Sequence, residues 1–206
     1  MGEIILSEMP DEGLMARTGQ GDRYAFEVLV RRHQASVLNL AHRFIGDPTR
    51  AEDLAQELFV RVWQSAKGYR PEAKFRTWMY RIVTNLCLNE LKSPWRKRLV
   101  PFHWFGSDGQ RSDDEGVETT IVDETPSPEE RLLAQERIRR VAHALQSLPG
   151  NQRLALILKR YEGLSYQEIA KVLGCSVSAV ESLLVRAKRN IREKLRREKN
   201  DRRFSG

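Results

Sequence analysis

The sequence has little from which a metal centre, a disulfide framework or a membrane span could be built. Its 206 residues include two cysteines and four histidines, whose scattered positions lack the spacing of metal ligands or of paired thiols. Cys87 and Cys175 are therefore expected to be small buried apolar residues in a reducing compartment. No apolar run approaches the ~20 residues of a transmembrane helix, and no basic-then-apolar signal pattern opens the chain. We expect a cytoplasmic protein with no metal, no cofactor and no membrane segment of its own.

Strand patterns are also scarce, since no segment alternates apolar and polar residues for long enough to indicate a sheet. Apolar residues instead recur at steps of three and four, which is typical of helices. We therefore predict an all-α fold. The helices are expected within 12–45 (two helices, ended by Gly46-Asp47-Pro48), over 51–63, over 75–91, from Ser127-Pro128 to the break at Leu148-Pro149, over 152–161, and as a final pair over 164–189.

The charge is distributed in three blocks. Basic residues exceed acidic ones by four over residues 1–98 and by nine over 129–206, whereas 99–128 carries a net charge of −6. Prolines and glycines interrupt the acidic block, which indicates a flexible linker. Two basic blocks on an acidic tether favour two nucleic-acid-binding modules, although solvated helix faces would also be charged. The sequence thus predicts two small helical domains, 1–98 and 129–206, joined by a flexible acidic linker.

The most informative motif lies in residues 164–189. Its first helical segment ends at Gly174, which can adopt the left-handed backbone that other residues resist. Ser176 is a suitable cap for a second helix, whose apolar face includes Val180. Ala170 is small enough for that helix to cross over it, and Val180 fills the angle between the two. This order favours a helix-turn-helix; the alternative is an ordinary helical hairpin in a core.

The second helix of such a motif can lie in the major groove of duplex DNA, with its N-terminal residues at the base edges. Glu181 could accept a hydrogen bond from a cytosine amino group or pair with Arg186. The basic residues that follow are expected to contact phosphates, so binding should weaken steeply with salt. The candidate DNA-binding residues are Ser176, Ser178, Ala179, Glu181, Ser182, Arg186, Lys188 and Arg189.

The predicted helix over 51–63 carries an acidic and amide face on an otherwise basic domain. Such a face can simply be solvated, or it can dock a protein partner by charge complementarity. The face consists of Glu52, Asp53, Gln56 and Glu57.

The next predicted helix interleaves aromatic and basic residues, which suits stacking on unpaired bases while phosphates are bound. Trp78 taken alone is more typical of a core residue, and we expect it to pack with Ile82 and Leu86. The polar residues able to contact single-stranded DNA are Arg76, Thr77, Arg81, Asn85 and Asn89.

Three runs in this order, Asp53 to Trp63, Phe75 to Asn85 and the helix-turn-helix, resemble bacterial sigma factors of the small extracytoplasmic-function type. The resemblance covers nearly the whole chain and implies a role in promoter recognition. It implies that the first domain binds the β′ clamp of core RNA polymerase through Asp53, Gln56 and Glu57. The helix over 75–85 would melt the minus-ten promoter element and capture a flipped base, with Arg76, Thr77, Trp78, Arg81 and Asn85 as its DNA-contacting residues.

The resemblance further implies that the second domain reads the minus-thirty-five promoter DNA and contacts the β flap. Many members of the family have basic residues where this chain has Glu181 and Leu183. The acidic linker would thread toward the active-site and RNA-exit channels, and a cognate anti-sigma factor is expected.

Two other functions are compatible with a helix-turn-helix. A one-component transcriptional regulator would bind its operator without polymerase. A DNA-processing enzyme would need a cluster of carboxylates for metal-assisted chemistry, and Glu52, Asp53 and Glu57 lack a companion. Because the sequence contains no nucleophile–base pair and no phosphate-cradling loop, we predict that the protein is not an enzyme.

Overall fold

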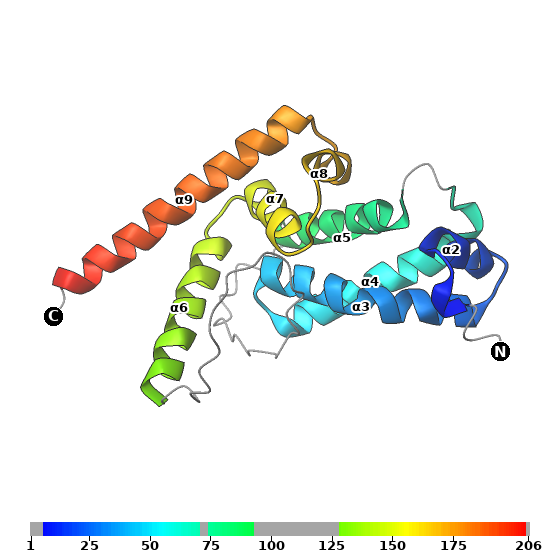
Figure 1. Cartoon of the computed structure of the whole chain (residues 1–206), viewed down its shortest axis with the longest axis horizontal. Helices are drawn as coiled ribbons and strands as arrows, with labels where there is room; N and C mark the ends of the chain where they lie inside the picture. Colours follow the sequence, from blue (N-terminus) through cyan, green and yellow to red (C-terminus); the bar gives the residue numbers. More distant parts are fainter. Residues whose placement is uncertain (1–5, 71–73, 93–127, 205–206) are drawn as a thin grey trace, which may run out of the picture.

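The computed structural model describes residues 6–70, 74–92 and 128–204. The predicted linker lies outside these ranges apart from Pro128, as does the proposed cap Ser127. Over the described ranges the elements are helical, which confirms the all-α prediction. Figure 1 shows an N-terminal group of helices, with α7 and α8 of the C-terminal group against it and α6 and α9 extending away.

The N-terminal group consists of α2 (Asp11–Gly19), α3 (Arg23–Ile45), α4 (Pro48–Ser65), the short 3-10 helix η1 (Ala66–Gly68) and α5 (Phe75–Lys92). The stop between α3 and α4 forms as the sequence predicts. Gly46 ends α3 at a φ of 84°, in the left-handed region. The Asp47 side chain then accepts a hydrogen bond from the Arg50 amide, and Pro48 occupies the first turn of α4.

The core of this group lies where α3, α4 and α5 pack together. Leu40 and Phe44 of α3, Leu58 of α4, and Met79 and Val83 of α5 are fully buried. Burial of these apolar side chains is the main contribution to the stability of the three-helix unit.

The buried face of α5 differs from the prediction. Leu86 is buried as expected, but Trp78 and Ile82 are only half-buried. Tyr80 is instead completely buried, because the C-terminal group covers the side of α5 on which it lies. Of the two cysteines, Cys87 is buried as predicted and Cys175 is half-buried.

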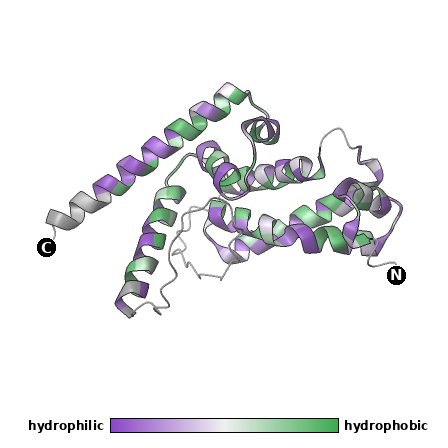
Figure 2. Ribbon diagram, viewed as in Figure 1, coloured by the Kyte–Doolittle hydropathy of each residue, from purple (hydrophilic) through white to green (hydrophobic). Residues whose placement is uncertain are grey.

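The C-terminal group consists of α6 (Pro128–Gln146), α7 (Gly150–Arg160), α8 (Tyr166–Leu173) and α9 (Val177–Phe204). Leu145 of α6 is buried, but apolar residues further toward its start, including Leu132 and Ile138, are exposed. Figure 2 shows several hydrophobic positions along α6 and mostly hydrophilic positions over the middle of α9.

The two groups meet through buried polar side chains as well as apolar ones. Arg153 of α7 is 2% exposed, and its guanidinium donates a hydrogen bond of 2.6 Å to the carbonyl oxygen of Phe44 on α3. The side-chain amide of Gln146 donates to the carbonyl oxygen of Arg43 at 2.9 Å. Helix α8 packs along α5. The C-terminal group is therefore seated on the helices α3 and α5 of its neighbour.

Candidate polymerase-binding and nucleic-acid-binding surfaces

The acidic and amide face predicted from the sequence lies on the exposed side of α4. Asp53, Gln56 and Glu57 are all exposed, because the apolar residues of α4 turn into the core. Asp53 pairs with Arg50 at 3.0 Å, and Glu57 pairs with Arg61 at 2.5 Å. Ion pairs at such exposed positions are weak. The carboxylates can therefore exchange these partners for those of another protein at little cost.

An apolar groove of about 870 Å³ runs beside this face, between α3 and α4. The rings of Phe26 and Trp63 meet edge to face in it, with centroids 5.1 Å apart. Trp63 is 38% exposed and Val60 is 53% exposed. Gln56 is one of its lining residues, so the groove and the acidic face form one continuous surface. The sequence reasoning missed the groove, although Val60 and Trp63 interrupt the polar side of α4 and signal it.

The residues proposed for single-stranded DNA on α5 do not share one environment. Arg81 and Asn85 are exposed, as is Asn89. Thr77 is 8% exposed, so in this conformation its side chain cannot contact DNA. Trp78 is half-buried beside the rings of Tyr69 and Phe75, at centroid distances of 5.2 and 5.8 Å. The structure brings Arg81 and Asn85 to the surface and withdraws Thr77 from it.

Arg76 is engaged by the C-terminal group. Its guanidinium donates a hydrogen bond of 2.7 Å to the carbonyl oxygen of Glu162, which lies in the turn between α7 and α8. The Glu162 carboxylate itself accepts a hydrogen bond from the hydroxyl of Tyr80. Glu162 is 7% exposed and Tyr80 is completely buried. This contact was not foreseen from the sequence, because it joins residues 82 positions apart.

The electrostatics of this contact follow from its burial. Burial raises the pKa of Glu162 above its ordinary value, although the Tyr80 hydrogen bond and the positive charges of Arg76 and Arg43 oppose the rise. Burial and the adjacent Glu162 raise the pKa of Tyr80 to about 12. Tyr80 therefore remains a protonated hydrogen-bond donor throughout the neutral range.

The helix-turn-helix has the geometry that the sequence predicts. The hydroxyl of Ser165 accepts from the amide of Glu168, and the Glu168 carboxylate accepts from the amide of Ser165, so that the two residues cap α8 reciprocally. Gly174 ends α8 at a φ of 66°. The Ser176 hydroxyl then accepts a hydrogen bond of 3.2 Å from the Ala179 amide in the first turn of α9.

The packing of the two helices also agrees with the motif. Ala170 is 7% exposed and Val180 is fully buried between α8 and α9. The opposite side of α9 faces solvent. Of the candidate DNA-reading residues, Ala179 is half-buried, and the exposed ones are Ser176, Ser178, Glu181, Ser182, Arg186, Lys188 and Arg189.

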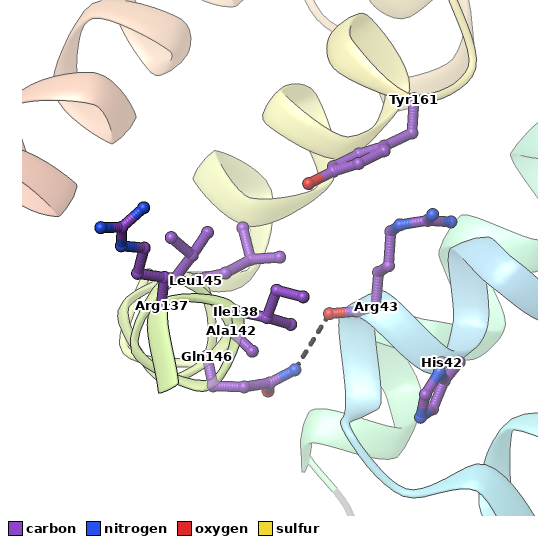
Figure 3. Close-up of a pocket in the computed structure, with 9 residues that line it drawn as sticks. His42, Arg43, Arg137, Ile138, Ala142, Leu145, Gln146 and Tyr161 are labelled. Atoms are coloured by element: carbon purple, nitrogen blue, oxygen red, sulfur yellow. Dashed lines mark hydrogen bonds between the residues drawn. The ribbon is translucent and has the colours of Figure 1, made fainter. Parts of the chain in front are cut away.

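A second cavity, of about 310 Å³, opens where α6 and α7 meet α3. Figure 3 shows Ile138, Ala142 and Leu145 on one side of it and His42 and Arg43 on the other, with Tyr161 above. The Arg43 guanidinium lies 4.2 Å from the centre of the Tyr161 ring, a cation–π contact that joins the two groups. The cavity is thus a gap within the interface between the groups.

In the described part of the chain, no three His, Cys, Asp or Glu side chains gather in a group that could ligate a metal ion. Among the described helices, none combines the length and the apolar character that crossing a bilayer requires. The C-terminal group contains a helix-turn-helix whose second helix is basic and exposed, and this group packs against another helical unit. These features place the protein in the class of helical DNA-binding proteins.

Comparison with known proteins identifies the family. Residues 29–97 match the family description "Sigma-70 region 2" and residues 138–191 match "Sigma-70, region 4". The chain is 36% identical over 188 residues to the RNA polymerase sigma-H factor of Pseudomonas aeruginosa, covering 91% of this chain and 94% of that one. It is 33% identical over 191 residues to the ECF RNA polymerase sigma-E factor of Haemophilus influenzae, covering 93% of this chain and 98% of the relative.

A solved structure agrees with these matches. The structure of CnrH in complex with the cytosolic domain of CnrY matches with a TM-score of 0.63 and 28% identity, over 90% of this chain and 96% of that chain. The chain belongs to the sigma-70 family, as a sigma factor of the extracytoplasmic-function type. Its function is transcription initiation with core RNA polymerase at promoter DNA, and the one-component regulator is not favoured.

Proposed function

We propose that the described surfaces divide the work of promoter recognition between the two domains predicted from the sequence, 1–98 and 129–206. The face of Asp53, Gln56 and Glu57 binds the β′ clamp of core polymerase. Helix α5 captures the minus-ten strand, and α9 reads the minus-thirty-five element. The protein acts by binding rather than by catalysis, in the cytoplasm where core polymerase and promoters are found.

The polymerase-binding role is supported by the surface of α4. Its exposed carboxylates hold only weak ion pairs, and they border an apolar groove with an exposed tryptophan. An apolar centre flanked by exchangeable charges is the usual composition of a protein–protein interface. This combination is the single observation that favours a docking surface over a solvated helix face.

The two DNA-binding roles are supported by exposure and charge. Arg81 and Asn85 are exposed on α5, on the same helix as the aromatic residue Trp78. Seven of the eight candidate residues of the helix-turn-helix are exposed along α9 and its cap. Basic residues on α9 are expected to contact phosphates, and the side chains near its start to reach base edges.

An anti-sigma factor is the proposed regulatory partner. The structural relative CnrH was solved in complex with the cytosolic domain of CnrY, and the match covers 90% of this chain and 96% of CnrH. In the structure described here, Arg76 is hydrogen-bonded to the C-terminal group and Thr77 is buried. A partner that stabilises this arrangement would keep Arg76 and Thr77 of α5 from promoter DNA.

The docking proposal is tested with the double variant Asp53→Ala, Gln56→Ala. We expect weaker binding of core polymerase, measured by fluorescence anisotropy, with an unchanged thermal unfolding transition. A matched control is Glu27→Ala, which removes an exposed carboxylate from α3 that also sits in a helical ion pair. Core affinity equal to that of the unsubstituted protein would refute the assignment. Transcription from a promoter by the purified protein with core tests the overall function.

A further inference from the structure

Helix α2 lies outside every surface assigned so far, yet it contacts the start of α5. The Glu12 carboxylate accepts a hydrogen bond of 2.7 Å from the backbone amide of Phe75, the first residue of α5. The amides in the first turn of a helix have no partner within the helix. A carboxylate there both satisfies an amide and interacts favourably with the helix dipole. Glu12 thus caps α5 from a distance of 63 residues in the chain.

The neighbouring residue fixes α2 itself. Asp11 accepts hydrogen bonds from the Arg32 guanidinium at 2.7 Å and from the His33 ring at 2.8 Å, both on α3. Although burial alone would raise it, these two partners hold the pKa of Asp11 below its ordinary value. Two adjacent carboxylates therefore bind two different helices, and α2 joins α3 to the beginning of α5.

The other end of α2 is held just as closely. A side-chain carbon at Gly19 would lie 2.6 Å from the carbonyl oxygen of Ala66 in η1. Such a distance is shorter than van der Waals contact, so the two backbones touch at this point. With Glu12 at one end and Gly19 at the other, α2 has little freedom to shift relative to α5.

The cap is linked to the candidate DNA-binding residues through a row of rings. The Phe75 ring lies 5.4 Å from the His33 ring and 5.8 Å from the Trp78 ring, measured between centroids. Arg76 and Trp78 occupy the first turn of α5 directly after the capped amide. A shift of Phe75 would therefore move the residues with which we propose that the protein captures the minus-ten strand.

We propose that Glu12 is a positioning residue for strand capture: it fixes the first turn of α5 in the orientation that binds the unpaired minus-ten strand. The inference rests on the proposed function of α5. Glu12 itself contacts no DNA in this scheme and acts through the amide of Phe75.

The test uses three substitutions of Glu12 in holoenzyme reconstituted with core polymerase. Glu12→Gln keeps an oxygen within reach of the amide, Glu12→Asp keeps the charge but is too short, and Glu12→Ala removes both. Promoter opening is followed with a fluorescent base in the minus-ten element, and core affinity by anisotropy. Glu27→Ala on α3, an exposed carboxylate paired with Arg31, is the matched control.

We expect Glu12→Ala and Glu12→Asp to lower the equilibrium for promoter opening about tenfold, the factor that corresponds to the free energy of one helix cap when strand capture requires the first turn of α5 to be in place. Glu12→Gln should stay within about threefold of the unsubstituted protein. Core affinity and binding of minus-thirty-five duplex DNA should not change. If Glu12→Ala fails to fold, the contrast between Gln and Asp at this position still decides the question.

Two further substitutions distinguish failure of the positioning role of Glu12 from failure of the proposed function of α5. Arg81→Ala and Asn85→Ala provide the reference, because both residues are exposed on α5. If these two lower promoter opening and Glu12→Ala does not, the positioning role is refuted and the function of α5 stands. A parallel loss of core affinity and opening would reduce Glu12 to a structural cap. If none of the substitutions affects opening, the proposed function of α5 itself fails.

Discussion

Tyr80→Phe tests whether the contact between the two groups controls access to the minus-ten surface. The substitution keeps the buried ring and removes only the hydroxyl that donates to Glu162. When the groups separate, water can hydrogen-bond to both side chains. We call the arrangement with the two groups in contact closed and the one with the groups separated open. The substitution therefore destabilises the closed arrangement and leaves the folding of each group nearly unchanged.

The magnitude follows from the environment of Glu162. Its side chain is 5% exposed, and the Arg76 guanidinium is 4.0 Å from its carboxylate oxygen, too far to replace the lost hydrogen bond. A hydrogen bond to a charged group contributes about 1.5–3 kcal/mol. Losing it should raise the fraction of open molecules roughly 10- to 150-fold, as long as the closed form predominates.

The assay measures binding of a labelled single strand carrying the non-template minus-ten sequence to the protein without core polymerase. The apparent affinity should rise by the same factor as the open fraction, and small-angle scattering should show a larger radius of gyration. Tyr24→Phe is the control, because Tyr24 is 67% exposed. If Tyr80→Phe changes neither affinity nor scattering, the contact does not restrict access to α5.

Three further predictions follow from single features. Burial raises the pKa of Glu162 in the closed form above its ordinary value of 4.5, so the closed form binds more protons than the open form. Closure should therefore weaken as the pH rises from 4.5 through the raised pKa, with strand affinity increasing over the same window. Gly174→Ala should lower the free energy of unfolding by about 1 kcal/mol, because its φ of 66° is strained for alanine, as urea unfolding would show. Arg153→Met should destabilise the interface by about 1–3 kcal/mol by leaving the Phe44 carbonyl oxygen unpaired, measured by thermal unfolding and scattering.

The sequence predicted best those features that depend on neighbouring residues. Gly46-Asp47-Pro48 ends one helix and starts the next through local backbone geometry and a local cap. Gly174 and Ser176 form the turn of the helix-turn-helix for the same reason. These signals are complete within a few residues, so no tertiary information is needed to interpret them.

Features that depend on contacts distant in the chain were missed. Periodicity assigned Trp78 and Ile82 to the buried face of α5. It cannot tell which apolar side of α5 packs inside the N-terminal group and which side is covered by the C-terminal group. Tyr80 is buried because Glu162 and its turn cover it. The groove beside Trp63 is also formed by two helices, and only the exposed apolar residues Val60 and Trp63 indicated it in the sequence.

The composition of the interface between the groups suits an arrangement that has to open. An interface of purely apolar residues would expose its full area to water on separation, at a cost that grows with that area. Here the interface also contains the polar residues Tyr80, Glu162 and Arg153, and each can exchange its protein partner for water when the groups separate. Each of them is nevertheless costly to leave unpaired while the groups are together. The polar contacts therefore make the closed arrangement specific, and separating the groups costs less than it would for a purely apolar interface of the same area. This suits a promoter-binding protein if α5 must be released before the minus-ten strand is captured.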